Sequence, residues 1–189
     1  MAMISKQTLR QKLLAQRKQV SAAQQRYAST AILQQLLTLD VFKTSQRLAA
    51  YLVHGQEVDP LNIMDYAWSV NKHCYVPRLQ DTCLSFVHYQ RSAPLRLNTY
   101  RIAEPLPPYD TLPVDKLDLI FLPLVGFDEQ GHRLGRGKGY YDRTLAHVKQ
   151  KPLLIGLAYE FQHIPSLSPD DWDVPLDFII TEKKTYSLD

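Results

Sequence analysis

The sequence predicts an α/β protein in which a mostly parallel central sheet lies between two layers of helices, a three-layer αβα sandwich. Short apolar runs typical of buried strands alternate along the chain with longer amphipathic segments typical of helices. The run DLIFLPLVGF (118–127) has no polar alternation, which indicates a strand buried on both faces. With 189 residues, 45% of them hydrophobic, the chain can bury a full core, and we expect residues 1–189 to form one domain.

The N-terminal part is predicted to contain three helices and a strand. Leu9, Leu13 and Leu14, among many Lys, Arg and Gln residues, give residues 5–20 the pattern of an amphipathic helix. A second helix should start after Ser21, because Ser21 and Gln24 have the spacing of a capping box. The apolar run 47–53 indicates a buried strand, and the Asp-Pro pair that opens the segment 59–68 is typical of the first turn of a helix.

The rest of the chain is richer in predicted strands. Residues 73–79 and 84–89 have the composition of two strands joined by the turn QDT. The segment 91–114 contains five prolines, so we expect a long surface loop there. After the buried run 118–127, we expect a helix at 140–150 and strands at 153–159 and 177–181, the latter being the last strand.

Composition and charge narrow the classes of function. Lys and Arg total 22 against 19 acidic residues, which gives a net charge of +3. This charge is too small to indicate nucleic-acid binding by itself, and a protein that binds an anionic small molecule would fit it as well as a nucleic-acid-binding protein. No apolar run approaches the ~20 residues that span a bilayer, so we expect a cytoplasmic protein that does not bind membranes. Cys74 and Cys83 lack metal-like spacing and no HExxH motif occurs, so neither a redox nor a zinc site is predicted.

The strongest functional signal is RLGRGKGYYDR (133–143). Five of the seven glycines lie within fourteen positions, 126–139. This segment follows a buried strand and precedes a predicted helix, where α/β sheets bind ligands and where backbone N–H groups face anions. Arg133, Arg136 and Lys138 add positive charge suited to phosphate. The standard mononucleotide and dinucleotide fingerprints do not match, so the segment predicts another type of phosphate site; a flexible connection with solvated charges is the alternative.

The longer segment FDEQGHRLGRGKGYYDR (127–143) resembles the signature of the 5-formyltetrahydrofolate cyclo-ligase family. The motifs KQTLR, YLVHGQEVD, YVPR and DWDVPLD agree with the family in the same order, so the resemblance covers nearly the whole chain. It departs at Leu124, where many members have glycine after the proline. Arg136 and Lys138 occupy positions that vary within the family and leave this chain with more positive charge than many members carry.

The resemblance implies an enzyme that uses ATP and Mg²⁺ to convert 5-formyltetrahydrofolate to 5,10-methenyltetrahydrofolate, with release of ADP and phosphate. A formamide carbonyl is a poor electrophile, and transfer of the γ-phosphoryl group to its oxygen creates a group that N10 can attack. Phosphoryl transfer depends chiefly on positioning and on cations around the phosphate oxygens. We expect a monomer, and the sequence leaves open whether the folate is polyglutamylated.

The family's site residues are carried over to the matching positions of this chain. The resemblance implies ATP contacts from Lys6, Arg10, Arg133, Leu134, Gly135, Arg136, Gly137, Lys138, Gly139, Tyr140 and Tyr141. It implies folate contacts from Arg10, Leu52, Glu57, Arg136, Gly137, Lys138, Gly139 and Tyr140, with the Glu57 carboxylate accepting two adjacent N–H groups of the pterin. It implies catalytic roles for Arg136, Lys138 and Tyr140, and a magnesium site at Asp142 and Asp173.

Several of these positions have plainer interpretations on the residues alone. Lys6 and Arg10 are an i, i+4 pair, which is typical of solvated charges as well as of a shared ligand. Asp142 is also a first-turn helix carboxylate favoured by the helix dipole, Glu57 an ordinary surface acid and Leu52 an ordinary strand residue. Three aromatic residues could stack on a ligand ring: Tyr51, Tyr100 and Trp172. Isolated aromatic residues are, however, more typical of a core.

Two other classes of function stay open. The predicted Rossmann-like topology is similar to that of sugar-phosphate isomerases and CoA transferases, which would use the basic loop for a phosphate without consuming ATP. Interleaved Arg, Lys and Tyr residues also fit a nucleic-acid-binding protein. Magnesium-dependent release of ADP separates the first alternative from a cyclo-ligase, and a steep salt dependence of oligonucleotide binding would favour the second.

Overall fold

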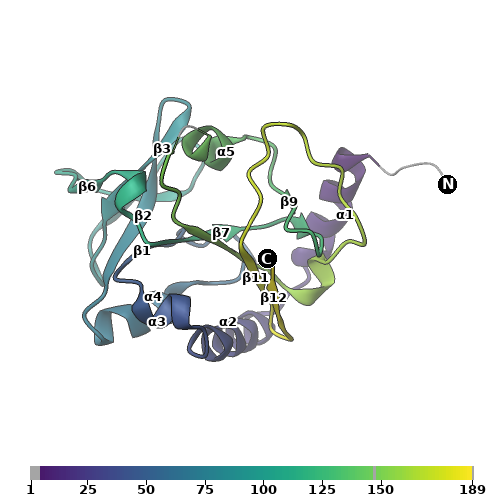
Figure 1. Cartoon of the computed structure of the whole chain (residues 1–189), viewed down its shortest axis with the longest axis horizontal. Helices are drawn as coiled ribbons and strands as arrows, with labels where there is room; N and C mark the ends of the chain where they lie inside the picture. Colours follow the sequence, from purple (N-terminus) through teal and green to yellow (C-terminus); the bar gives the residue numbers. More distant parts are fainter. Residues whose placement is uncertain (1–4, 147, 189) are drawn as a thin grey trace.

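The computed structural model describes residues 5–146 and 148–188. Within this part of the chain, the main sheet has eight strands in the order β12-β11-β10-β7-β1-β2-β3-β6 (Figure 1). The neighbours from β11 to β2 run parallel, whereas β12, β3 and β6 are antiparallel additions at the edges, so the predicted α/β fold is confirmed. The strands are β1 (Arg47–Ala49), β2 (His73–Gln80), β3 (Cys83–His88), β6 (Thr111–Leu112), β7 (Leu119–Pro123), β10 (Leu153–Leu157), β11 (Phe178–Ile180) and β12 (Thr185–Ser187).

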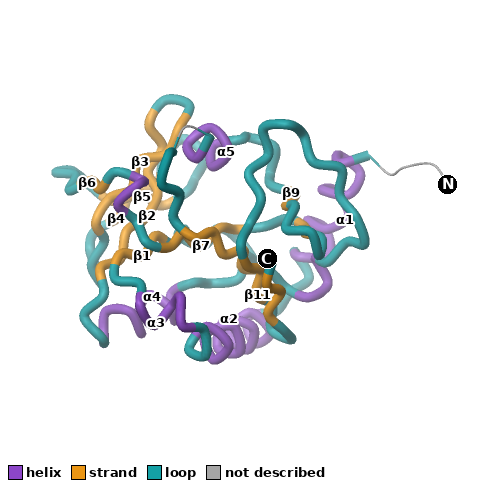
Figure 2. The backbone as a smooth tube through the Cα atoms, viewed as in Figure 1, coloured by secondary structure: helices purple, strands orange, loops and turns teal. Residues whose placement is uncertain are grey.

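The two faces of the sheet are covered unequally. The helices α2 (Ala22–Leu36), α3 (Asp40–Thr44) and α4 (Leu61–Ser69) lie together on one face (Figure 1). The short helix α5 (Tyr140–Leu145) lies on the other face, where long loops form much of the layer (Figure 2). The helix α1 (Lys6–Arg17) contacts a separate hairpin, which is formed by β8 (Gly126–Phe127) and β9 (Arg133–Leu134). Two short 3-10 helices are η1 (Val114–Lys116) and η2 (Glu160–Gln162).

Alternation along β7 divides the core between the two faces. Leu119 and Phe121 pack into the cluster formed with α2, α3 and α4. Ile120 and Leu122 pack into the cluster on the opposite face, together with Leu145 of α5. Successive strand side chains point to opposite faces, so a strand covered on both sides needs apolar residues at every position. The uninterrupted apolar run that predicted this strand has this physical cause.

Both predicted N-terminal helices are confirmed, and so is the capping box. Ser21 accepts a hydrogen bond from the Gln24 backbone N–H while the Gln24 side chain accepts one from the Ser21 backbone. Ser5 caps α1 by accepting from the N–H of Thr8. Helix α4 begins one residue later than the Asp-Pro pair suggested, and Asp59 accepts a hydrogen bond from the N–H of Leu61.

Other predicted boundaries were wrong. The predicted loop 91–114 contains an antiparallel pair, β4 (Leu95–Leu97) with β5 (Ala103–Pro105), and β6, which extends the main sheet. Pro94, Pro105 and Pro113 lie at or beside the ends of these edge strands, where no ladder N–H is needed, and the other two prolines lie between β5 and β6. The strand expected at 47–53 and the helix expected at 140–150 are both shorter, and β12 follows the strand that was expected to be last.

No helix in the described ranges is both long enough and apolar enough to cross a membrane.

Candidate active site

The glycine-rich loop, residues 135–139, follows the hairpin β8–β9 and leads directly into α5, beyond the carboxyl end of β7. Gly137 and Gly139 have φ values of 86° and 64°, a left-handed conformation that is strained for residues with a side chain. Gly139 is also the N-cap of α5. Glycine at these two positions therefore lets the loop adopt a backbone shape that other residues rarely adopt.

Helix α1 brings Arg10 onto this loop. The Arg10 Nε donates to the carbonyl oxygen of Gly135 at 2.9 Å, and the guanidinium lies against Gly137. Lys6, one turn earlier, donates to Asp170 at 2.7 Å and to Asp173 at 3.4 Å. The ion pairs with these aspartates raise the pKa of Lys6 above its ordinary value against a desolvation effect that lowers it. The i, i+4 pair thus connects α1 to both the glycine loop and the 170–173 segment.

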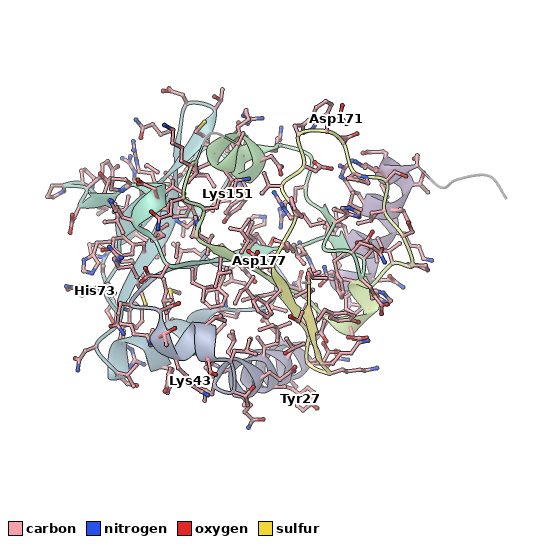
Figure 3. All side chains as sticks on the ribbon, in the orientation of Figure 1. Tyr27, Lys43, His73, Lys151, Asp171 and Asp177 are labelled. Atoms are coloured by element: carbon pink, nitrogen blue, oxygen red, sulfur yellow. The ribbon has the colours of Figure 1, made fainter. Side chains whose placement is uncertain are left out.

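Asp142 and Asp173, the predicted metal ligands, lie at the same place in the fold. Asp142, in the first turn of α5, accepts hydrogen bonds from the Arg133 guanidinium and from the N–H of Val174 at 3.2 Å. Arg133 also donates to the carbonyl of Val174. Asp173 precedes Val174 directly, and Figure 3 shows the neighbouring Asp171 at the tip of the loop that runs between α1 and α5.

This pair of carboxylates fits a cation that arrives with most of its own ligands. Among the described residues, no group of three or more His, Cys, Asp or Glu side chains could hold a metal ion. Mg²⁺ keeps several waters and typically takes one or two carboxylates together with phosphate oxygens. The donor set of Asp142 and Asp173 therefore suits magnesium bound to a nucleotide, and does not suit a metal enclosed by protein alone.

Glu57 lies at the centre of a buried cluster of charges. Its carboxylate Oε1 accepts from Arg136 Nη2 at 2.8 Å and from Arg17 Nη2 at 3.4 Å, and Oε2 accepts from the N–H of His54 at 3.1 Å. Only 5% of Glu57 is exposed, so the interpretation as an ordinary surface acid was wrong. The loop and the predicted pterin acceptor are joined directly through Arg136.

Arg17 is a member of this cluster that the sequence reasoning missed. It is 5% exposed, and its Nη1 donates to the carbonyl of Leu124 at 3.0 Å. Burial lowers the pKa of the Arg17 guanidinium, whereas the charge of Glu57 raises it. Arg17 follows Arg10 and Leu13 at helical spacing, so a cation in line with the buried face of α1 was the available signal.

Three tyrosine and tryptophan positions differ in their surroundings. Tyr100 is half exposed, and its hydroxyl lies 3.3 Å from that of Tyr140, a hydrogen bond that raises the pKa of Tyr140. Lys138 Nζ lies 5.8 Å from the centre of the Tyr100 ring. Trp172 is 69% exposed and borders an open pocket of about 250 Å³, so neither aromatic belongs to the core. The other residues lining that pocket are Gly137, Lys138, Gly139, Asp142, Arg143 and Ala146.

Four other predicted positions have mainly buried side chains. Tyr51 is buried and donates to the carbonyl of Val58, so stacking on a ligand is excluded in this conformation. Leu134 packs with Leu13, which leaves its backbone as the part able to meet a nucleotide. Leu52 is partly buried against the core. The Tyr141 hydroxyl lies inside the protein, and burial raises its pKa well above the ordinary value.

The leucine at position 124 is accommodated by a glycine on the neighbouring strand. Leu124 is 2% exposed, and a Cβ atom at Gly156 of β10 would lie 2.7 Å from Leu124 Cδ1. A side chain at position 156 would therefore require Leu124 to move. Leu124 also presents its carbonyl to Arg17 and to the side chain of Gln162.

Together, the fold and this site have the features of an α/β enzyme with a positively charged, glycine-rich loop beyond the carboxyl end of its central strand. The sequence model of the 5-formyltetrahydrofolate cyclo-ligase family matches residues 2–182, and the chain belongs to this family. The cyclo-ligase of Haemophilus influenzae is 35% identical over 176 residues, covering 90% of this chain and 94% of that protein. The cyclo-ligase of Escherichia coli K12 is 32% identical, covering 90% and 96%.

Solved structures agree with this assignment. The 5,10-methenyltetrahydrofolate synthetase of Aquifex aeolicus has a TM-score of 0.85 at 34% identity, covering 98% of this chain and 93% of that chain. The synthetase of Mycoplasma pneumoniae has a TM-score of 0.78 at 26% identity, covering 95% and 100%. The family resemblance, the enzyme class and the α/β fold expected from the sequence are confirmed.

Proposed function

We propose that the chain catalyses the ATP- and Mg²⁺-dependent cyclisation of 5-formyltetrahydrofolate to 5,10-methenyltetrahydrofolate, with release of ADP and phosphate. The observation that carries the proposal is the 2.8 Å contact between Arg136 and Glu57. It joins the glycine-rich loop, which suits phosphate, to a buried carboxylate, which suits the paired N–H donors of a pterin. A folate at Glu57 would therefore lie beside a nucleotide at the loop.

The chemistry requires this juxtaposition. The formyl oxygen attacks the γ-phosphorus of ATP, the bond to the β,γ-bridging oxygen breaks, and ADP leaves. N10 then attacks the formyl carbon, its proton passes to solvent, and phosphate departs with the former formyl oxygen. The two steps form one C–N bond and expel no water. Phosphoryl transfer of this kind is accelerated mainly by positioning and by positive charge around the transferred group.

The loop and α1 supply that charge in our proposal. Arg136 and Lys138 lie exposed in the loop. Arg133 lies in β9 just before the loop, and Arg10 of α1 contacts its first residue, Gly135. Arg10, Arg133 and Arg136 each bond a carbonyl or carboxylate oxygen, and polyphosphate oxygens are acceptors of the same kind. Lys138 lies near the Tyr100 ring. Glycine N–H groups of residues 135–139 add donors that no side chain obstructs.

Asp142 and Asp173 are the residues that would hold Mg²⁺, with Lys6 as a further phosphate contact. When bound, the cation would neutralise charge on the nucleotide phosphates. Lys6 and Arg133 orient the two carboxylates through the ion pairs described above.

On the folate side, Glu57 would accept two N–H donors of the pterin, and Leu52 would contact its apolar surface. Arg136 reaches from the loop to this carboxylate, and Arg10 contacts the loop at Gly135. Tyr140, whose hydroxyl donates to that of Tyr100 at 3.3 Å, is the residue that we assign to the formyl end of the substrate.

The proposal is tested by mixing the protein with ATP, Mg²⁺ and 5-formyltetrahydrofolate and following the absorbance of the methenyl product. ADP and product should form in equal amounts, and omission of any one component should abolish both. Product without ADP formation would favour an enzyme that does not consume ATP, as in the isomerase and transferase classes. The absence of both would overturn the proposal.

A further inference from the structure

Glu57 is fixed from several elements of the fold. Gln25 of α2 donates to the Glu57 backbone carbonyl at 2.6 Å, and the Tyr51 hydroxyl donates to the carbonyl of Val58. The His54 N–H and two guanidinium groups occupy the carboxylate. A side chain held this closely presents its oxygens in one direction, as a planar ligand edge with paired donors requires.

The two arginines that contact Glu57 have different surroundings. The Arg17 side chain is 6% exposed, and its second donor group is engaged by the carbonyl of Leu124. The Arg136 side chain is 42% exposed and lies in the glycine-rich loop. Arg136 can turn towards solvent or a phosphate oxygen at little cost, whereas movement of Arg17 would leave a buried guanidinium without its partners.

We infer that Arg17 is a positioning residue for folate, the fixed counter-ion that holds the Glu57 carboxylate in its orientation when Arg136 leaves it. This inference rests on the proposed role of Glu57 as pterin acceptor. Neutral N–H donors of a pterin replace the hydrogen bonds of Arg136 but not its charge. A carboxylate as buried as Glu57 is strongly destabilised without a cation, and Arg17 is the cation that stays.

Arg17 also connects the two halves of the site. Leu124, whose carbonyl it holds, lies between β7 and the hairpin that carries the glycine-rich loop. Gln162 donates to the same carbonyl at 2.7 Å and to that of Val125 at 2.9 Å. The backbone here thus keeps a partner when Arg17 is replaced, so loss of Arg17 should affect Glu57 more than the hairpin.

A double-mutant cycle tests the inference. The affinity for 5-formyltetrahydrofolate is measured by calorimetry without ATP for wild type, Arg17→Met, Glu57→Gln and the double variant. Arg17→Met should weaken folate binding by about tenfold or more, while in the Glu57→Gln background the same change should cost less than about threefold, because residues that act through one another are not additive. ATP affinity, measured separately, should change less than about threefold in Arg17→Met.

Arg17→Lys is the conservative variant, which keeps the charge and should recover part of the lost folate affinity. It also provides the same cycle if Arg17→Met does not fold. Equal losses of folate affinity in both backgrounds would show that Arg17 only supports the fold and would overturn the inference. If the wild-type protein forms methenyl product but the effects of the two substitutions on folate affinity are additive, this inference alone is refuted. If the wild-type protein neither binds nor converts the folate, the proposed function is refuted.

Discussion

The guanidinium of Arg133 and the carboxylate of Asp142 form an ion pair that ties the end of the β8–β9 hairpin to the first turn of α5. Both residues also bond the backbone of Val174, which follows Asp173. The glycine-rich loop is therefore closed at its base, and the segment with the second candidate metal ligand is fastened to the same point. Positive and negative groups of the candidate site belong to one network.

Replacement of Asp142 by Asn separates a metal role from a structural one. We expect the magnesium concentration for half-maximal rate to rise on the order of tenfold, because an amide attracts a hydrated cation less than a carboxylate does. Loss of the first-turn carboxylate of α5 should also lower the free energy of unfolding by about 0.3 to 1 kcal/mol, and the weakened pair with Arg133 should add to this loss. Magnesium titrations and thermal melts of one protein give both values.

Asp118→Asn is the matched control, since Asp118 pairs with Arg47 at 3.1 Å. It should lower stability and leave the magnesium titration unchanged. A lowered melting temperature with an unaltered magnesium titration in Asp142→Asn would show that this carboxylate serves the helix end only.

Replacement of Lys138 by Ala should impair the use of ATP far more than stability. Lys138 is exposed in the loop, and loss of one charge-assisted contact with phosphate costs about 1.5 to 3 kcal/mol, or on the order of ten- to a hundredfold in kcat/KM for ATP. Lys183→Ala, an exposed lysine between β11 and β12, is the control and should leave the kinetics unchanged. Wild-type kinetics in Lys138→Ala would refute the assignment.

Replacement of Glu57 by Gln should damage the folate side selectively. An amide has one acceptor oxygen, so it cannot take two N–H groups of a pterin edge as a carboxylate does. The KM for 5-formyltetrahydrofolate should rise on the order of ten- to a hundredfold, with ATP affinity retained. The opposite pattern, lost nucleotide affinity with a normal folate KM, would exclude the role of pterin acceptor.

Tyr159 offers a test of the buried interior beside the Glu57 cluster. Its hydroxyl is buried without a hydrogen-bond partner among the described residues, and burial raises its pKa to about 12. Tyr159→Phe should leave the free energy of unfolding unchanged or raise it by up to about 1 kcal/mol, because an unpaired hydroxyl is lost. Tyr51→Phe, which removes the donor to Val58, should lower it by about 1 kcal/mol. A marked loss of stability in Tyr159→Phe would mean that the hydroxyl has a partner.

Local sequence patterns predicted the features that depend on neighbouring residues. The capping box at Ser21, the buried strand β7 and the glycine-rich loop follow from spacing and composition within a few positions. The short strands β4, β5 and β12 were not predictable in this way, because each is only three residues long and depends on pairing with another segment.

In the candidate site, too, features set by neighbouring residues were predictable and features set by tertiary packing were not. The loop cations were evident from the sequence, whereas the burial of Arg17 beside Glu57 depends on how α1 packs against the end of the sheet. Tyr51 and Trp172 were indistinguishable as aromatic residues, and only the fold separates the buried side chain from the exposed one. The single-domain organisation, the monomeric state and the cytoplasmic location stay predictions.

The most direct test of the central claim follows the formyl oxygen. Wild-type protein is incubated with ATP, Mg²⁺ and 5-formyltetrahydrofolate that carries ¹⁸O in its formyl group, and the released phosphate is examined by mass spectrometry. Phosphoryl transfer to the formyl oxygen predicts one ¹⁸O atom in each phosphate, in proportion to the methenyl product. Unlabelled phosphate, with the ¹⁸O recovered in water, would contradict the account.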